Sequence, residues 1–333
     1  MSQVDSPRRR DLWLTRLYYF VMLGGSGFIQ PFLNLYYTRV GLSGTSIGII
    51  TATGAIISLV VAPMWTNASQ HHQHPRRLLQ LALILTALFY LLLGMQTVFW
   101  GILMVAALRA LVSAGISPIS DALTLSVTHA SKSGFGSVRV WASMGWIIVT
   151  LLGGGLIEQT GFSSAFIGVT VVTFAGAFIL IPITPHYFSR KTSGQLPLGI
   201  IATLRRVLTN RAMLGLMAML TIIGIMNNGV GQFETVYLNT LGAKETMLGI
   251  AGVMSAIVEI PCMLWADRLT HQRGARKLLL ISMLMMGFVR LMVFIAPSIG
   301  MILAERKLYA LKNWMSTSET KVMVIASGSE RPE

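Results

Sequence analysis

The sequence predicts an all-α polytopic membrane protein, and two observations carry this prediction. Hydrophobic residues make up 53% of the 333 residues and charged residues only 11%, whereas about 25% of the residues in soluble domains are charged. Apolar runs also recur along the chain at the length of about 20 residues that an α-helix needs to cross the hydrocarbon core of a bilayer.

The apolar runs define the predicted spans. They cover residues 13–37, 45–66, 78–96, 98–125, 136–157, 163–184, 212–239, 246–266 and 277–296, and a tenth run starts near Pro297. We predict an N-terminal six-helix bundle over 1–184, a cytoplasmic linker over 185–211, a partial C-terminal bundle over 212–306 and an aberrant polar tail over 307–333.

The net charge of +14 comes from loops on one side of the predicted membrane. Basic residues precede the first span and follow the second, fourth, sixth and eighth, as in Arg8–Arg10, Arg76–Arg77, Lys132, Arg205–Arg206 and Arg276–Lys277. The alternate loops hold almost none, with Arg39 and Lys244 as exceptions. This pattern predicts a cytoplasmic N-terminus in the cell (inner) membrane. The basic charge therefore records topology, and we expect no nucleic-acid partner.

An internal repeat relates the two halves. Residues 32–49 and 233–250 align without a gap at an offset of 201, with six identities. The identical pairs are Phe32/Phe233, Tyr36/Tyr237, Gly41/Gly242, Thr45/Thr246, Gly48/Gly249 and Ile49/Ile250. Two repeats of six spans in the same orientation, joined by a cytoplasmic linker, resemble the plan of the major facilitator superfamily, which implies a substrate site between the halves at mid-membrane. The loop 266–277 resembles the superfamily's basic signature loop through Asp267, Arg268, Arg276 and Lys277.

Two charges lie inside the predicted fourth and fifth spans. Asp121 and Arg139 are each nine residues from Ala130, so each lies about 13 Å from the turn. Equal depth on consecutive antiparallel helices predicts that they pair, which lowers the cost of burying them. The alternative is a salt bridge that only joins two helices. Ser143 and Trp146 follow Arg139 on one helix face, so this stripe offers a guanidinium, a hydroxyl and an indole ring to a substrate.

The segment 118–146 resembles the lactose permease and 3-phenylpropionate permease branch of that superfamily, in its Pro-x-x-acid followed by F-G-x-x-R-x-W-A. The resemblance implies that Asp121, Arg139 and Trp146 contact the substrate. We also assign Asn227 to substrate binding, since it lies one heptad before Glu234. Glu234, Glu259 and Arg290 are the predicted proton-coupling residues. Arg109 resembles the superfamily's span-four arginine; the alternative is that it snorkels to an interface.

Enzyme, cofactor and metal functions are not indicated. The chain has one cysteine, Cys262, and no nucleophile–base pair or phosphate-binding loop. The histidine-rich stretch 71–74 matches no ligand spacing well and is expected to be a solvated loop. We expect no cofactor and predict a monomer that binds a small molecule, protons and the lipid bilayer.

The predicted function is a proton symporter for a small organic solute, such as an aromatic acid, a saccharide or a nucleoside. By the repeat, the second half should extend to about residue 385 (184 plus 201), whereas the sequence has 333 residues. We therefore expect about 9 to 10 of 12 helices. The alternative function is a truncated, non-transporting membrane remnant or interaction protein.

Overall fold

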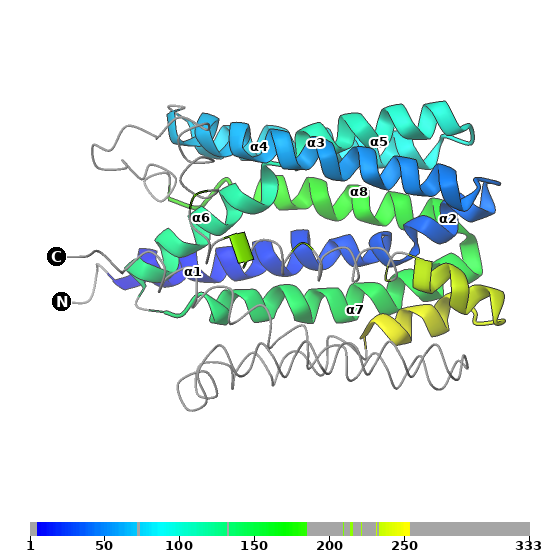
Figure 1. The fold of residues 1–333 in the computed structure, drawn as a ribbon. Coiled ribbons are helices and arrows are strands. Elements are labelled where there is room, and N and C mark those ends of the chain that lie inside the picture. Colours follow the sequence, from blue (N-terminus) through cyan, green and yellow to red (C-terminus); the bar gives the residue numbers. More distant parts are fainter. Residues whose placement is uncertain are drawn as a thin grey trace.

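The computed structural model describes residues 5–71, 74–131, 133–184, 209, 214–215, 221, 231 and 233–253. All regular elements within these ranges are helices, which confirms the all-α class (Figure 1). Five helices of this part are long and apolar enough to cross a membrane. They are α3 (Gly44–His71), α4 (Pro75–Gly94), α5 with α6 (Phe99–Ser113 and Ile116–Ala130), α7 (Gly136–Thr160) and α8 (Phe162–Ile179).

The first predicted span exists but is not a regular α-helix. It consists of α1 (Asp5–Tyr18), the π-helix η1 (Tyr19–Leu23), the 3₁₀ turns η2 (Ser26–Phe28) and η3 (Gln30–Phe32), and α2 (Leu33–Arg39). Local sequence explains the interruption. Gly24, Gly25 and Gly27 have low helix propensity. Pro31 has no N–H to donate to the carbonyl of residue 27, and its ring would clash with that carbonyl in a regular α-helix.

The fourth span breaks between α5 and α6 because of one proline. Pro118 has no N–H to donate to the carbonyl of Ala114, so the hydrogen-bond ladder of α5 ends there. Within the first turn of α6 a proline is tolerated, since the first N–H groups of a helix have no internal partner. The indole of Trp65 on α3 packs against the break and donates to the carbonyl of Leu111 at 2.8 Å. The break therefore places Asp121 in the second turn of a new helix.

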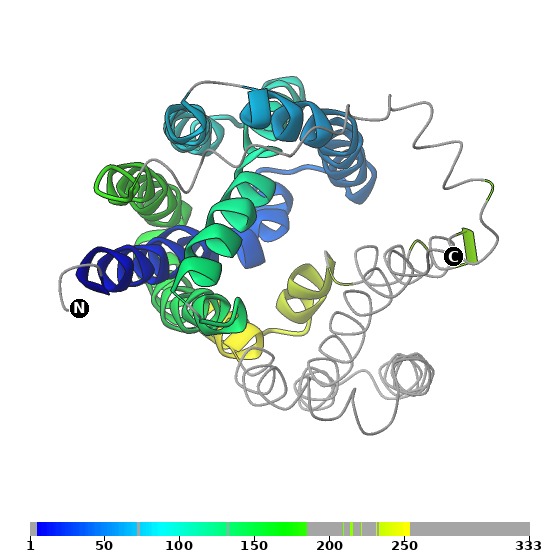
Figure 2. The same ribbon diagram turned by 90° about the vertical axis from the view of Figure 1, so that its left-hand side faces the viewer.

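The helices pack around two apolar clusters stacked along the bundle. One contains Tyr18, Tyr19, Leu83 and Leu123; the other contains residues of both repeats, such as Phe32, Phe166, Leu238 and Leu248. Large apolar side chains also cover the outside of the bundle, as expected where lipid replaces water. In Figure 2, which looks along the helices from the end that holds the N-terminus, residues 245–253 (yellow) lie beside α7.

The internal repeat is visible in the backbone. Gly41 and Gly242 have φ angles of 87° and 89°, a region that glycine adopts without strain. Leu42 N donates to Tyr37 O, and Ala243 N donates to Leu238 O, both at 3.0 Å. These bonds close the same helix-ending turn, a Schellman motif, in each half. The offset of 201 read from the sequence is thus a structural repeat.

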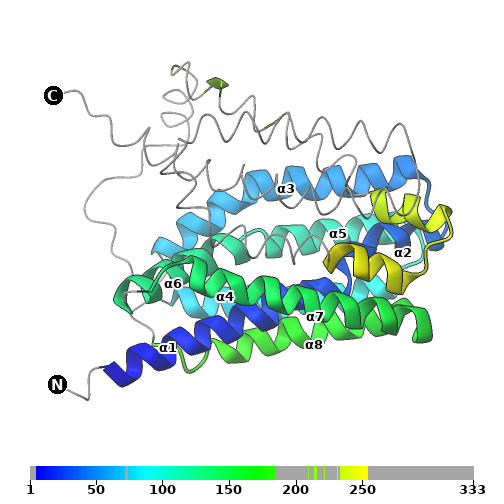
Figure 3. The same cartoon turned by 90° about the horizontal axis from the view of Figure 1, so that it is seen from below.

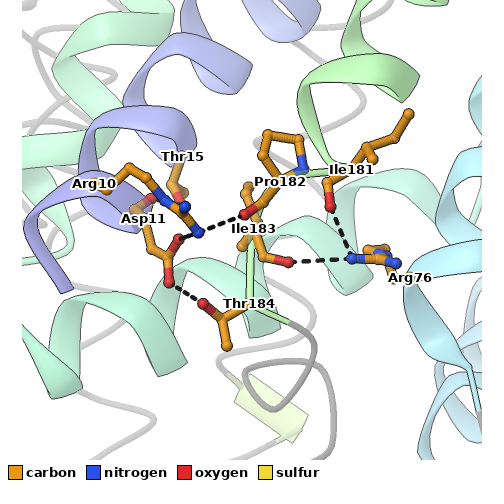
Figure 4. Close-up of polar contacts among 8 residues, drawn as sticks. All are labelled: Arg10, Asp11, Thr15, Arg76, Ile181, Pro182, Ile183 and Thr184. Atoms are coloured by element: carbon orange, nitrogen blue, oxygen red, sulfur yellow. Dashed lines mark hydrogen bonds and ion pairs between the residues drawn. The ribbon is translucent and has the colours of Figure 1, made fainter. Parts of the chain in front are cut away.

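The two ends of the bundle differ in chemistry. The end that carries Arg10 and Arg76 is called the basic end below, and the end that carries the turns at Gly41, Gly161 and Gly242 is called the far end. At the basic end, Arg76 donates to the carbonyls of Ile181 and Ile183, at 2.9 and 3.2 Å, just after α8 (Figure 4). The guanidinium thus binds two carbonyls of the non-helical segment that follows α8.

A second basic-end contact joins the first span to the same segment. Arg10 donates to the carbonyl of Pro182 at 3.0 Å, and the buried carboxylate of Asp11 accepts a hydrogen bond from the hydroxyl of Thr184. Figure 4 shows these side chains meeting between α1 and the chain that leaves α8. The end of the sixth predicted span is therefore fastened to α1.

Replacing Arg76 by glutamine is expected to lower the stability of the first bundle by about 1 kcal/mol, because two carbonyls lose a charged donor. The adjacent Arg77 is exposed, so Arg77→Gln provides a matched control. Thermal unfolding of the detergent-purified protein should show a fall of about 2–4 °C for Arg76→Gln and little change for Arg77→Gln. Equal shifts in the two variants would show that the contacts of Arg76 with the segment after α8 do not contribute to stability.

Candidate substrate site

The site begins with a carboxylate held by a tyrosine. Asp121 lies on α6, half-buried, and its Oδ1 accepts a hydrogen bond of 2.8 Å from the hydroxyl of Tyr19 on η1. The preceding residue, Tyr18, forms a hydrogen bond of 2.8 Å with Ser120. Two successive tyrosines thus meet two successive residues of α6, and the π-helical turn that begins at Tyr19 accompanies this arrangement. Single π-helical turns of this kind are frequent at functional sites.

The predicted direct pairing of Asp121 with Arg139 is wrong in this structure. Within the described ranges, no ion pair joins these two residues. The first span packs against both α6 and α7. The hydroxyl of its Tyr19 donates a hydrogen bond to the carboxylate of Asp121. The prediction used depth alone, and depth does not determine which lateral neighbour a side chain faces.

The predicted stripe on α7 is present. Arg139 is exposed, and Ser143 and Trp146 are half-buried on the same helix. Between them, Gly145 lies against the backbone of Gly24 and Phe20 in the first span. This close approach brings the stripe beside the segment that carries Tyr19, so α6, η1 and α7 together contribute the candidate site.

Arg109 contacts an aromatic ring rather than a carboxylate. Its Nη1 donates to the hydroxyl of Tyr90 at 3.3 Å, and its guanidinium lies 4.9 Å from the centre of the same ring. No ion pair of Arg109 is found among the described residues. A cation–π contact of this kind stabilises a charge away from water by about 1–2 kcal/mol.

Most predicted residues of the second half lie outside the described residues. These are Asn227, Glu259 and Arg290, together with the signature-loop residues Asp267, Arg268, Arg276 and Lys277. Glu234 is described and lies half-buried in the helix 233–240, next to Phe233, which packs on the apolar cluster shared by both repeats. The assignment of these residues to proton coupling and conformational change stays a prediction.

Sequence reasoning missed Tyr19. The available signal was the pair Tyr18–Tyr19 inside an apolar run, since a buried tyrosine hydroxyl usually requires a partner. It also missed Glu158 on α7 and Glu245, which bind the two basic residues that depart from the one-sided charge pattern.

A family model described as the MFS_1 like family matches residues 12–311. The chain belongs to this family. Maltose permease of Geobacillus stearothermophilus is 30% identical to the chain over 280 residues, which are 80% of this chain and 67% of that protein. An uncharacterized transporter, YwbF, of Bacillus subtilis (strain 168) is 25% identical over 89% of this chain and 73% of its own length. The chain is therefore a transporter of the major facilitator superfamily and not an enzyme.

Solved structures of major facilitator transporters have the same fold. The nucleoside transporter NupG superposes with a TM-score of 0.78 at 13% identity, over 96% of this chain and 83% of that chain. A bacterial homolog of the human lysosomal transporter Spinster, in an inward-facing and unoccupied conformation, gives a TM-score of 0.71 at 17% identity, over 98% and 80% of the two chains. These similarities confirm the predicted all-α fold. Membership of the family makes the chain a multi-pass membrane protein that binds small molecules and lies in a lipid bilayer.

Proposed function

We propose that this family member is a proton-coupled symporter that carries a small hydroxylated solute, above all a saccharide, by alternating access. The observation that carries the proposal is the Asp121 carboxylate, held by Tyr19 within a membrane span. A carboxylate accepts charge-assisted hydrogen bonds from sugar hydroxyls, and such bonds are about twice as strong as neutral ones. The similarity to a maltose permease supports the same substrate class.

Each residue of the site has a role in this proposal. Asp121 accepts from the solute, Arg139 and Ser143 donate to it, and the indole of Trp146 stacks on the apolar face of a sugar ring. A solute bound there joins Asp121 to Arg139, which are not paired with each other in this structure. Asn227 adds an amide from the second half.

Proton coupling is assigned to the carboxylates of the second half. Glu234 and Glu259 bind and release the proton, while Arg290 favours the ionised form of a neighbouring carboxylate. Arg109, held against Tyr90, supplies a further fixed positive charge. The signature-loop residues Asp267, Arg268, Arg276 and Lys277 take part in the conformational change.

The basic end is proposed to face the cytoplasm of a cell-membrane protein that acts as a monomer. Arg10 and Arg76 both bind the segment that follows α8, so their charges lie at one end of the bundle. An excess of arginine and lysine marks the cytoplasmic side of membrane proteins.

Uptake by the purified protein in liposomes tests the proposed function. Labelled maltose, uridine and 3-phenylpropionate would each be offered with and without an imposed pH gradient. We expect maltose to accumulate only with the gradient, and a proton ionophore to abolish its accumulation. Binding of maltose without accumulation would instead favour a non-transporting membrane protein, and accumulation of only the aromatic acid would contradict the saccharide assignment.

A further inference from the structure

The two repeats meet at the far end through α7 and the helix 245–253 (Figure 3). Two glycines permit the approach: a Cβ on Gly154 would lie 2.8 Å from the carbonyl oxygen of Glu245, and a Cβ on Gly249 would lie 3.0 Å from that of Thr150. The apolar cluster shared by both repeats lies at the same end. In this conformation residues 233–253, the described part of the second half, therefore pack closely against the first half at the far end.

Two ion pairs cross this contact. The guanidinium of Arg39, at the end of α2, binds the carboxylate of Glu245. The ammonium of Lys244 lies 3.4 Å from Glu158 on α7. Glu158 also accepts hydrogen bonds from Thr246, at 2.5 Å from its hydroxyl and 3.4 Å from its backbone N–H. This N–H lies in the first turn of the helix 245–253, where a carboxylate is favoured.

The carboxylates are more buried than their basic partners. The side chain of Glu245 is 8% exposed and that of Glu158 is 31% exposed, whereas Arg39 and Lys244 are 51% and 74% exposed. A carboxylate as buried as that of Glu245 is costly unless it is paired, whereas Glu158 lies at the surface. The pairs therefore favour the closed arrangement, because separating the two halves removes the partner of each carboxylate.

Folding of the local turn does not require these charges. The first repeat has the same turn, with the same backbone hydrogen bonds, but Ser43 and Gly44 stand where the second repeat has Lys244 and Glu245. Arg39 and Lys244 are also the two basic residues that depart from the one-sided charge pattern. Their placement is explained by a contact between the halves rather than by topology or by the turn.

We propose that Arg39–Glu245 and Lys244–Glu158 form a latch that closes the far end, and that both pairs must separate before the site can be reached from that side. The proposal rests on transport by alternating access. Its residues lie outside the candidate substrate site, so they set the balance between conformations rather than the affinity for the solute.

Thiol labelling measures the equilibrium between the two conformations without a substrate. In a Cys262→Ser background, a cysteine replaces Ser143 on the site stripe, and an impermeant maleimide is applied from the far end in right-side-out vesicles and from the basic end in inverted vesicles. Arg39→Gln combined with Lys244→Gln removes the exposed partner of each pair. We expect labelling from the far end to rise about tenfold and labelling from the basic end to fall, as the equilibrium shifts.

Matched variants distinguish the specific loss of the latch from a general loosening of helix packing. Gln159→Ala changes an exposed neighbour of Glu158 and should leave both labelling rates unchanged. The reversed pair, Arg39→Glu with Glu245→Arg, should restore slow labelling that Arg39→Glu alone has lost. If Glu245→Arg does not fold, Lys244→Glu with Glu158→Lys provides the same reversal at the second pair.

Two outcomes overturn the latch: unchanged labelling in the double glutamine variant, or faster labelling from both ends, which indicates loosening. A protein that fails to accumulate any solute but shows the opposite shifts at the two ends would disprove the proposed transport while supporting the latch. The two proposals therefore fail separately.

Discussion

Replacing Gly145 by valine is expected to destabilise the folded protein by about 3 kcal/mol or more. A Cβ at this position would lie 2.3 Å from the carbonyl oxygen of Phe20 and 3.0 Å from the Cα of Gly24. Both neighbours are backbone atoms, so no side-chain rotation relieves the clash. The first span would have to move away from α7, and apolar contacts along both helices would be lost.

Gly155 provides the matched control on the same helix. A Cβ there meets no atom of the described residues within 4 Å, so Gly155→Val should have little effect. Thermal unfolding in detergent and the yield of monodisperse protein would compare the two variants. Similar behaviour of the two valine variants would show that the close approach of the first span to α7 does not limit stability.

The second large effect is expected at Asp121. Asp121→Asn keeps the size of the side chain but removes the charge, so the solute loses a charge-assisted hydrogen bond of about 1.5–3 kcal/mol. Saccharide binding should weaken by about 10- to 100-fold. Ser126→Ala, at a half-buried position whose hydroxyl donates only to the backbone of the same helix, is the control and should bind like the unaltered protein. Equal affinities of all three proteins would exclude Asp121 from the site.

Variants of two neighbouring tyrosines can distinguish an effect on the position of the Asp121 carboxylate from an effect on the stability of the protein. Tyr18 and Tyr19 are both fully buried and both hydrogen-bonded, but only Tyr19 donates to Asp121. Each phenylalanine variant should lose about 1 kcal/mol of stability with its hydrogen bond. Only Tyr19→Phe should also weaken binding, by roughly tenfold, because the carboxylate is no longer held. Titration calorimetry of the purified variants would measure the difference.

The candidate substrate site lies beside the breaks in the first and fourth spans. Pro118 lies in the first turn of α6, just before Asp121, and the interruption of the first span begins with Tyr19. Irregular backbone inside a membrane occurs where protein or a cavity covers it. These breaks could be anticipated from the proline and the glycines, but the hydrogen bond between the two segments could not, since it joins residues 102 positions apart.

The sequence by itself determined the class of protein, the approximate positions of the five membrane-length helices that the structure describes, and the repeat that the paired glycine turns confirm. Hydropathy and the positions of arginine and lysine report depth along the membrane normal, because the cost of burial depends on depth. The tertiary structure alone decided the lateral neighbours: Tyr19 for Asp121, Tyr90 for Arg109, and carboxylates across the repeat contact for Arg39 and Lys244. Packing between helices selects these partners, and the order of residues along one span does not encode it.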